Sequence, residues 1–173
     1  MPRADFDEFV KRQQTVKAET ASIDWNKERD EWLRNLEALY DQIESYLTPY
    51  RSAGQVDIGY RDIPLNEENI GSYMAREMIL RIGLQEIIFT PRGTMFIGLK
   101  GRVDVRGQAG MSGLALVNKK TVGARKLLSR PPATTPSEPI EWVWKIATPP
   151  PQITFIDFTQ ETFFDMILAV SNG

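Results

Sequence analysis

Three charged residues alternate along one short segment and form the clearest candidate for a binding or catalytic surface. Arg102, Asp104 and Arg106 are separated by Val103 and Val105, and this alternation places the charged side chains on one face of a β-strand. The two arginines could bind an anion, and Asp104 could act as a base. The pattern is also typical of the solvated face of an antiparallel sheet, where opposite charges pair across strands. We favour this second interpretation, because alternation alone predicts it.

A basic segment is the second candidate surface. Residues 118–147 carry six basic and two acidic side chains. The basic residues that could contact phosphate groups are Lys119, Lys120, Arg125, Lys126 and Arg130. Such contacts could bind nucleic acid, but no aromatic side chain lies among them to stack on a base. We therefore expect a long solvated loop over residues 118–139, rich in proline. Nucleic-acid binding through residues 119–130 stays open as a further alternative function, less favoured than a protein partner.

Acidic side chains are the third candidate. Paired carboxylates can hydrolyse glycosides or hold Mg²⁺. The acids considered are Glu67 and Glu68, together with Asp57, Asp62, Glu77 and Glu86 of neighbouring predicted strands. Glu141 and Lys145 are the nearest approach to the acid–lysine pattern of a Mg²⁺-dependent nuclease, and their spacing is poor. A carboxylate-dependent hydrolase or nuclease with Mg²⁺ therefore stays open as an alternative function.

The amino-acid composition excludes several classes of site. The chain has 173 residues, no cysteine and no histidine. The absence of cysteine excludes disulfides, thiolate catalysis and sulfur-bound zinc, and the absence of histidine excludes Ser-His-Asp catalysis. No apolar run approaches the roughly 18 residues of a membrane-spanning helix. We expect a cytoplasmic protein with no cofactor, no metal site and no membrane partner.

The positions of the glycines divide the chain into two regions, and the secondary structure of these regions must position the candidate residues. Residues 1–53 contain none of the 12 glycines, and residues 54–123 contain eleven. Apolar spacing predicts a short helix over residues 4–18 and a long helix from Trp25 to Pro49. The side chains expected to face the core from the long helix are Trp32, Leu36, Leu39, Tyr40, Ile43 and Leu47. The first 53 residues should therefore form a helical pair.

After Gly54 the apolar period changes to two, which predicts strands. The expected strands cover residues 56–61, 73–82, 84–90, 94–99, 102–106, 111–117, 140–147 and 152–158, with turns at Pro91–Gly93 and Lys100–Gly101. Thr159 should cap a closing helix. The fold class is α+β, a single domain over residues 1–173. Its antiparallel meander of about eight strands, strongly curved or barrel-like, should have the N-terminal helical pair and the C-terminal helix packed on it.

These features favour a non-enzymatic protein-interaction module of the accessory or immunity type. The expected partner is another protein, and homodimerisation through the long helix stays open. The candidate partner-binding residues are Arg102, Asp104, Arg106, Lys119, Lys120, Arg125 and Lys126.

Overall fold

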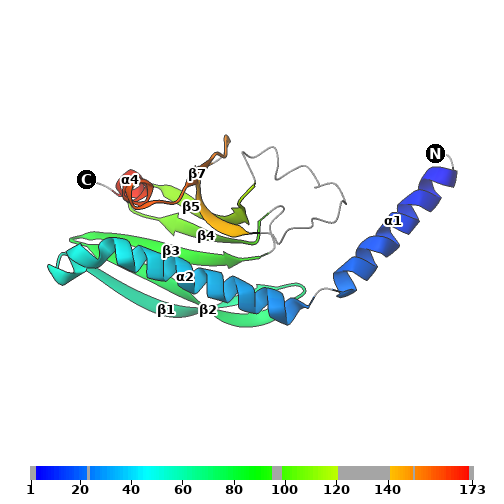
Figure 1. Cartoon of the computed structure of the whole chain (residues 1–173), viewed down its shortest axis with the longest axis horizontal. Helices are drawn as coiled ribbons and strands as arrows, with labels where there is room; N and C mark the ends of the chain where they lie inside the picture. The colour runs from blue at the N-terminus through cyan, green and yellow to red at the C-terminus, as the bar shows by residue number, and fades with distance from the viewer. Residues whose placement is uncertain (1–2, 23, 95–98, 121–140, 150, 172–173) are drawn as a thin grey trace.

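The computed structural model in Figure 1 is an α+β fold with helices on an antiparallel sheet. The structure describes residues 3–22, 24–94, 99–120, 141–149 and 151–171. Within them, the helices are α1 (Arg3–Ser22), α2 (Trp25–Ser52) and α4 (Gln160–Val170). The strands are β1 (Val56–Glu67), β2 (Gly71–Ile82), β3 (Gln85–Gly93), β4 (Gly101–Arg106), β5 (Met111–Asn118), β6 (Trp142–Ala147) and β7 (Phe155–Asp157).

The seven strands form one sheet in the order in which they occur along the chain. Each strand pairs antiparallel with the next, from β1 and β2 to β6 and β7. The predicted meander is therefore confirmed, with seven strands instead of eight. The sheet is open, since β1 and β7 lie at opposite edges, so the expected closure toward a barrel is wrong.

The predicted turn at Pro91–Gly93 is wrong because these residues continue β3. Pro91 lies opposite Val103 of β4, and the register shifts between Pro91 and Gly93. This is a β-bulge, and Gly93 accommodates it with φ 102°. Bulges and turns favour the same residue types, so the sequence alone did not distinguish them.

The predicted hairpin at Lys100–Gly101 is also wrong. Gly101 is the first residue of β4 and pairs with Leu116 of β5. A Cβ at position 101 would overlap the Trp32 ring, so packing against α2 explains this glycine. The strand expected over residues 94–99 falls largely outside the described residues.

Helix α2 forms the main cover of one face of the sheet (Figure 1). All six side chains predicted to face the core are buried. Burying side chains of this size contributes about 1.5–3 kcal/mol each before entropy is counted. Asp24 caps the first turn by accepting a hydrogen bond from the Lys27 amide. The helix continues through Pro49 to Ser52, and Gly54 follows with φ 73°. Pro49 has no amide hydrogen to donate to the Ser45 carbonyl, and the helix ends three residues later.

Helix α4 packs into the same core as α2. Thr159 and Thr162 form a reciprocal capping box at its start, which confirms the predicted closing helix. The Phe163 ring lies 5.9 Å from that of Tyr46 on α2 and 6.4 Å from that of Phe89 on β3, centroid to centroid. The inner face of the sheet is thus shared by two helices.

Helix α1 stands away from the rest of the molecule (Figure 1). Every side chain from Arg3 to Ala18 is exposed. The helix predicted over residues 4–18 is confirmed, but its expected packing on the sheet is wrong. Its apolar stripe is thin, so it offers little area to bury. None of the described helices has the length and apolar content needed to cross a membrane.

Candidate functional site

The outer face of the sheet, opposite α2, carries the charged cluster that the sequence singled out. Val103 and Val105 of β4 are buried in the core, so Arg102, Asp104 and Arg106 project to the outer face. Arg102 Nε lies 3.0 Å from Asp104 Oδ1. The predicted alternation is present, and this ion pair lies within β4 instead of across strands.

A third arginine completes the cluster. Arg92 Nε lies 3.0 Å from Asp104 Oδ2, so both carboxylate oxygens of Asp104 have an arginine partner. The Asp104 side chain is 19% exposed. This arrangement suits a carboxylate that holds two guanidinium groups in place better than one that accepts a proton from a substrate.

Arg92 belongs to this face because β3 continues through the predicted turn. Thr90 pairs directly with Asp104, and Arg92 follows two residues later. The residues that line the resulting hollow of about 140 Å³ are Thr90, Arg92, Asp104, Arg106 and Met111. Arg92 was not predicted because the expected strand ended at Thr90. Continued alternation from Ile88 and Thr90 to Arg92 was the signal that could have found it.

A buried acid lies next to this hollow on β2. The Glu77 side chain is 7% exposed, and Arg61 of β1 donates a hydrogen bond to it. The Thr90 hydroxyl donates a second hydrogen bond, 2.8 Å long, to the same carboxylate. Glu77 is therefore paired with Arg61, and its contacts with Arg61 and Thr90 together link three adjacent strands, β1, β2 and β3.

The basic residues Lys119 and Lys120 do not join this cluster. Arg102, the member of the cluster nearest to them, pairs with Ala115, and Lys119 lies four residues further along, roughly 14 Å at about 3.4 Å per residue. Lys119 forms an ion pair with Glu141, and the Lys120 amide donates to Asn118. The other predicted contacts, Arg125, Lys126 and Arg130, lie outside the described residues.

Several of the acidic residues considered for catalysis interact with other side chains. Glu67 accepts hydrogen bonds from the Tyr73 hydroxyl and from Thr94. Glu86 pairs with Arg81, which also lies 3.7 Å from Asp57. Lys145 pairs with Asp157 across β6 and β7. In the part of the chain that the structure describes, no group of three or more acids is placed to hold a metal ion.

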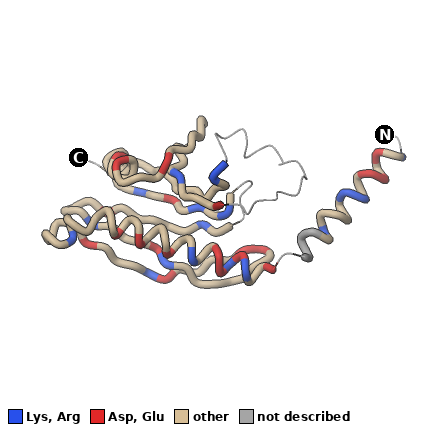
Figure 2. Tube along the Cα trace, viewed as in Figure 1, with Lys and Arg blue, Asp and Glu red and all other residues tan. Residues whose placement is uncertain are grey.

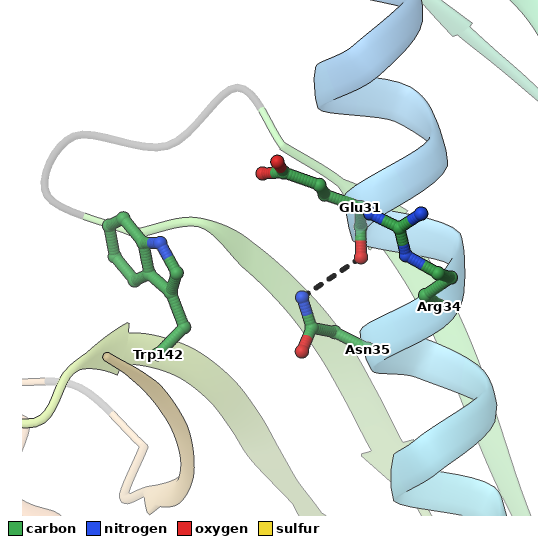
Figure 3. A pocket seen from close by; sticks show the side chains of 4 residues that line it. All are labelled: Glu31, Arg34, Asn35 and Trp142. Atoms are coloured by element: carbon green, nitrogen blue, oxygen red, sulfur yellow. Dashed lines mark hydrogen bonds between the residues drawn. The ribbon is translucent and has the colours of Figure 1, made fainter. Parts of the chain in front are cut away.

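A second hollow, of about 520 Å³, lies between α2 and the start of β6 (Figure 3). It is lined by Glu31, Arg34 and Asn35 of α2 and by Trp142. The Asn35 side chain donates a 2.9 Å hydrogen bond to the Glu31 carbonyl, one turn earlier on α2. This hydrogen bond holds two of the lining residues together on one side of the hollow.

Lys100 pairs with two acids of α2, one of which, Glu31, lines this hollow. Its ammonium group contacts Glu28 and lies 3.0 Å from Glu31, and it lies 5.5 Å from the centre of the Trp142 ring. Burial alone would lower the pKa of Lys100, but hydrogen bonds to Glu28 and Glu31 outweigh it and raise that pKa. The hydrogen bond from Lys100 lowers the pKa of Glu31. These shifts indicate a structural ion-pair cluster.

An apolar groove of about 440 Å³ runs between α4 and strands β5 to β7. Its apolar lining includes Met111, Ile146, Ile156, Met166 and Val170, and Asp165 lies at its edge. Ile156 and Met111 are 39% and 52% exposed. The groove could accept an apolar side chain, but it offers no reactive group.

No protein-family model, curated protein or solved structure matches this chain.

Proposed function

We propose that this chain is a protein-interaction module of the accessory or immunity type, which presents α1 to a groove on another protein. The observation that carries the proposal is an amphipathic helix held away from the body with its apolar side chains exposed. Phe6, Phe9, Val10 and Val16 are 60%, 49%, 37% and 41% exposed. The Phe6 and Phe9 rings lie 6.3 Å apart, so they form one continuous apolar surface.

The helix gains little stability from its own chain. Most of the stability of a helix in a protein comes from packing of its apolar face, and α1 buries no described side chain. It has no matching surface on α2, whose outward side carries the exposed residues Asp30, Arg34, Asp41 and Gln42. Burial of both phenylalanines in a partner's groove would supply the missing packing.

The charges on α1 define the kind of groove that fits it. Arg3 begins α1, the acids Asp5, Asp7 and Glu8 follow it, and the basic residues Lys11 and Arg12 come next (Figure 2). This order favours the helix itself, because acids suit its N-terminus. It also selects a partner whose apolar groove has basic groups at one end and acidic groups at the other.

Affinity capture with the full chain tests this proposal. The double variant Phe6→Asp/Phe9→Asp should lose a partner that the wild type retains in stoichiometric amount. At 100° per residue, Ala4 and Thr15 lie on the opposite side of the helix, so Ala4→Asp/Thr15→Asp is a control with the same added charge. The control should retain the partner, and both variants should melt like the wild type.

Three outcomes would contradict the proposal. Equal retention or equal loss in both variants would show that the apolar stripe is not the contact. A homodimer of the pure chain that the double phenylalanine variant abolishes would make the partner a second copy. Absence of any partner, together with micromolar Mg²⁺ binding, would favour the carboxylate-dependent enzyme instead.

A further inference from the structure

We propose that the apolar groove between α4 and strands β5 to β7 is a second docking site, which takes a basic amphipathic segment of another protein. Such a segment carries large apolar side chains on one face and lysine or arginine beside them. The inference does not depend on the role of α1, because none of the described residues that line the groove belongs to α1.

The groove has apolar walls that come from both the sheet and the closing helix. Ile146 of β6 and Ile156 of β7 are cross-strand partners, and Met166 and Val170 lie one turn apart on α4. The volume of about 440 Å³ is within the range of about 300–1,000 Å³ for pockets that hold drug-sized ligands. The groove can therefore accept large apolar side chains from one turn of a helix or from a short strand.

Part of this apolar surface is in contact with solvent. Ile156 and Met111, which both line the groove, are 39% and 52% exposed. Methionine side chains are flexible and adapt to neighbours of different shape. Burial of these side chains under a partner would remove apolar area from water, which is the main favourable contribution to most protein association. The groove is thus suited to apolar anchor residues.

The rim of the groove on α4 is acidic. Asp165 is the one charged residue among the described residues that line it, and Glu161 lies one turn earlier on the same side of the helix. Residues 148–173 contain three acids and no basic residue. In the described parts of the chain, no ion pair includes Asp165 or Glu161. Both negative charges are therefore available to a partner.

Basic side chains of the neighbouring strands belong to other surfaces. Lys145 of β6 pairs with Asp157 of β7, and Arg106 of β4 lines the separate hollow that contains Asp104. A lysine or arginine of the partner, placed beside its apolar anchors, would pair with the acids of α4, whereas an acidic segment would be repelled. The charge of the rim therefore selects a basic partner.

Methyl NMR on the full chain tests the groove with a defined probe. The probe is a short amphipathic peptide with leucine and phenylalanine on one face and lysines beside them. Its titration should shift the methyl signals of Met111 and Met166 and saturate, with a dissociation constant below about 1 mM. Met74 is also exposed but lies on β2, which two strands separate from β5, so its signal should not move.

Two further peptides separate the contributions of charge and apolar area. A peptide with glutamate in place of each lysine should bind at least about tenfold more weakly. A peptide with alanine in place of leucine and phenylalanine should give no saturable shift, because it lacks the anchors. Added salt should weaken binding of the lysine peptide, since the acids of α4 are exposed.

Substitutions then test the acidic rim. Glu161→Gln/Asp165→Asn should weaken binding of the lysine peptide by about threefold to tenfold and reduce its salt dependence. Asp5→Asn/Glu8→Gln on α1 makes the same charge change away from the groove and should leave binding unchanged. All four positions are exposed, so both variants should melt like the wild type.

A second pair of substitutions tests the groove itself. Ala169 is exposed and lines the groove, so the indole of Ala169→Trp would occupy part of its volume and should weaken peptide binding by at least about tenfold. Leu168 is 72% exposed and is not a lining residue. Leu168→Trp therefore places the same ring outside the groove and should leave binding unchanged.

Several results would overturn the site. Shifts that do not saturate, or that are equally large at Met74, would show that the peptide does not bind in the groove. Equal affinity for the lysine and glutamate peptides would reject a basic partner. Equal losses in Ala169→Trp and Leu168→Trp would place the contact elsewhere. Dimerisation of the pure chain that Ala169→Trp abolishes would make a second copy the occupant.

Discussion

Helices α1 and α2 are neighbours in the chain, and both are rich in charged residues, yet they have opposite relations to the core. Helix α2 buries six large side chains against the sheet, and α1 leaves every side chain from Arg3 to Ala18 in solvent. The difference lies in the apolar pattern. The buried residues of α2 recur at three- and four-residue steps over its length, whereas α1 has a thin stripe at Phe6, Phe9, Val10 and Val16.

The comparison teaches that helical periodicity predicts an element more reliably than it predicts what the element packs against. Both helices exist as the sequence predicts. The width of the apolar face separates a helix that builds its own domain from one that depends on another surface. The following predictions test this separation by stability measurements.

The largest effect is expected at the centre of the buried face of α2. Leu39 is 0% exposed, and Leu39→Ala should reduce the free energy of unfolding by about 2–5 kcal/mol through lost burial and a residual cavity. Urea denaturation measures this directly, and the melting temperature should fall by roughly 2–4 °C per kcal/mol. A variant that melts within a degree or two of the wild type would show that α2 is not a core element.

A smaller effect, with a defined pH dependence, is expected where α2 is tied to β4. The Lys100 side chain is 9% exposed, and Lys100→Met removes its ammonium group, which contacts Glu28 and Glu31. The expected loss is about 1–2 kcal/mol at pH 7, because both carboxylates are partly exposed and can be rehydrated.

The sign of the pH dependence follows from Glu31. Its pKa is lowered in the folded protein, so its contribution to stability is present above the unfolded pKa of about 4.3 and is lost as the pH falls through the folded value. The difference between wild type and Lys100→Met should therefore shrink between pH 5 and pH 3. A difference that is constant over this range would mean that lost packing, not the ion pairs, causes the effect.

The smallest effect is expected on α1. Phe9→Ala should change the free energy of unfolding by less than about 0.5 kcal/mol, because Phe9 is 49% exposed and its ring lies beside Phe6 of the same helix. Urea denaturation alongside Leu39→Ala provides the comparison. A loss above about 1 kcal/mol would place α1 against the body of the protein and would remove the basis for its role as a binding arm.

The sequence predicts structural features correctly where the apolar periodicity matches the observed burial. The buried face of α2, the alternation in β4 and the cap at Thr159 follow from local rules. The path of the chain from β3 to β4 did not follow from local rules, because Pro91 and Gly93 suit a β-bulge as well as a turn. This one ambiguity ended the predicted strand too early and concealed Arg92.

The candidate sites show the same limit. Arg102, Asp104 and Arg106 lie on one strand, so alternation alone brings them together. Arg92 reaches Asp104 only through the pairing of β3 with β4, and the ion pair between Lys100 and Glu31 joins residues far apart in the chain. Such contacts depend on register and on helix docking, which no local pattern specifies.

The open sheet has a consequence for self-association. Its two edges, β1 and β7, could each accept a strand from another molecule, which is a common route to aggregation. β7 has three residues, too few for a stable new ladder. β1 has twelve, but it carries Asp57, Arg61 and Asp62, and Pro64 lacks an amide hydrogen. Both edges therefore discourage strand addition, one by its length and the other by its composition.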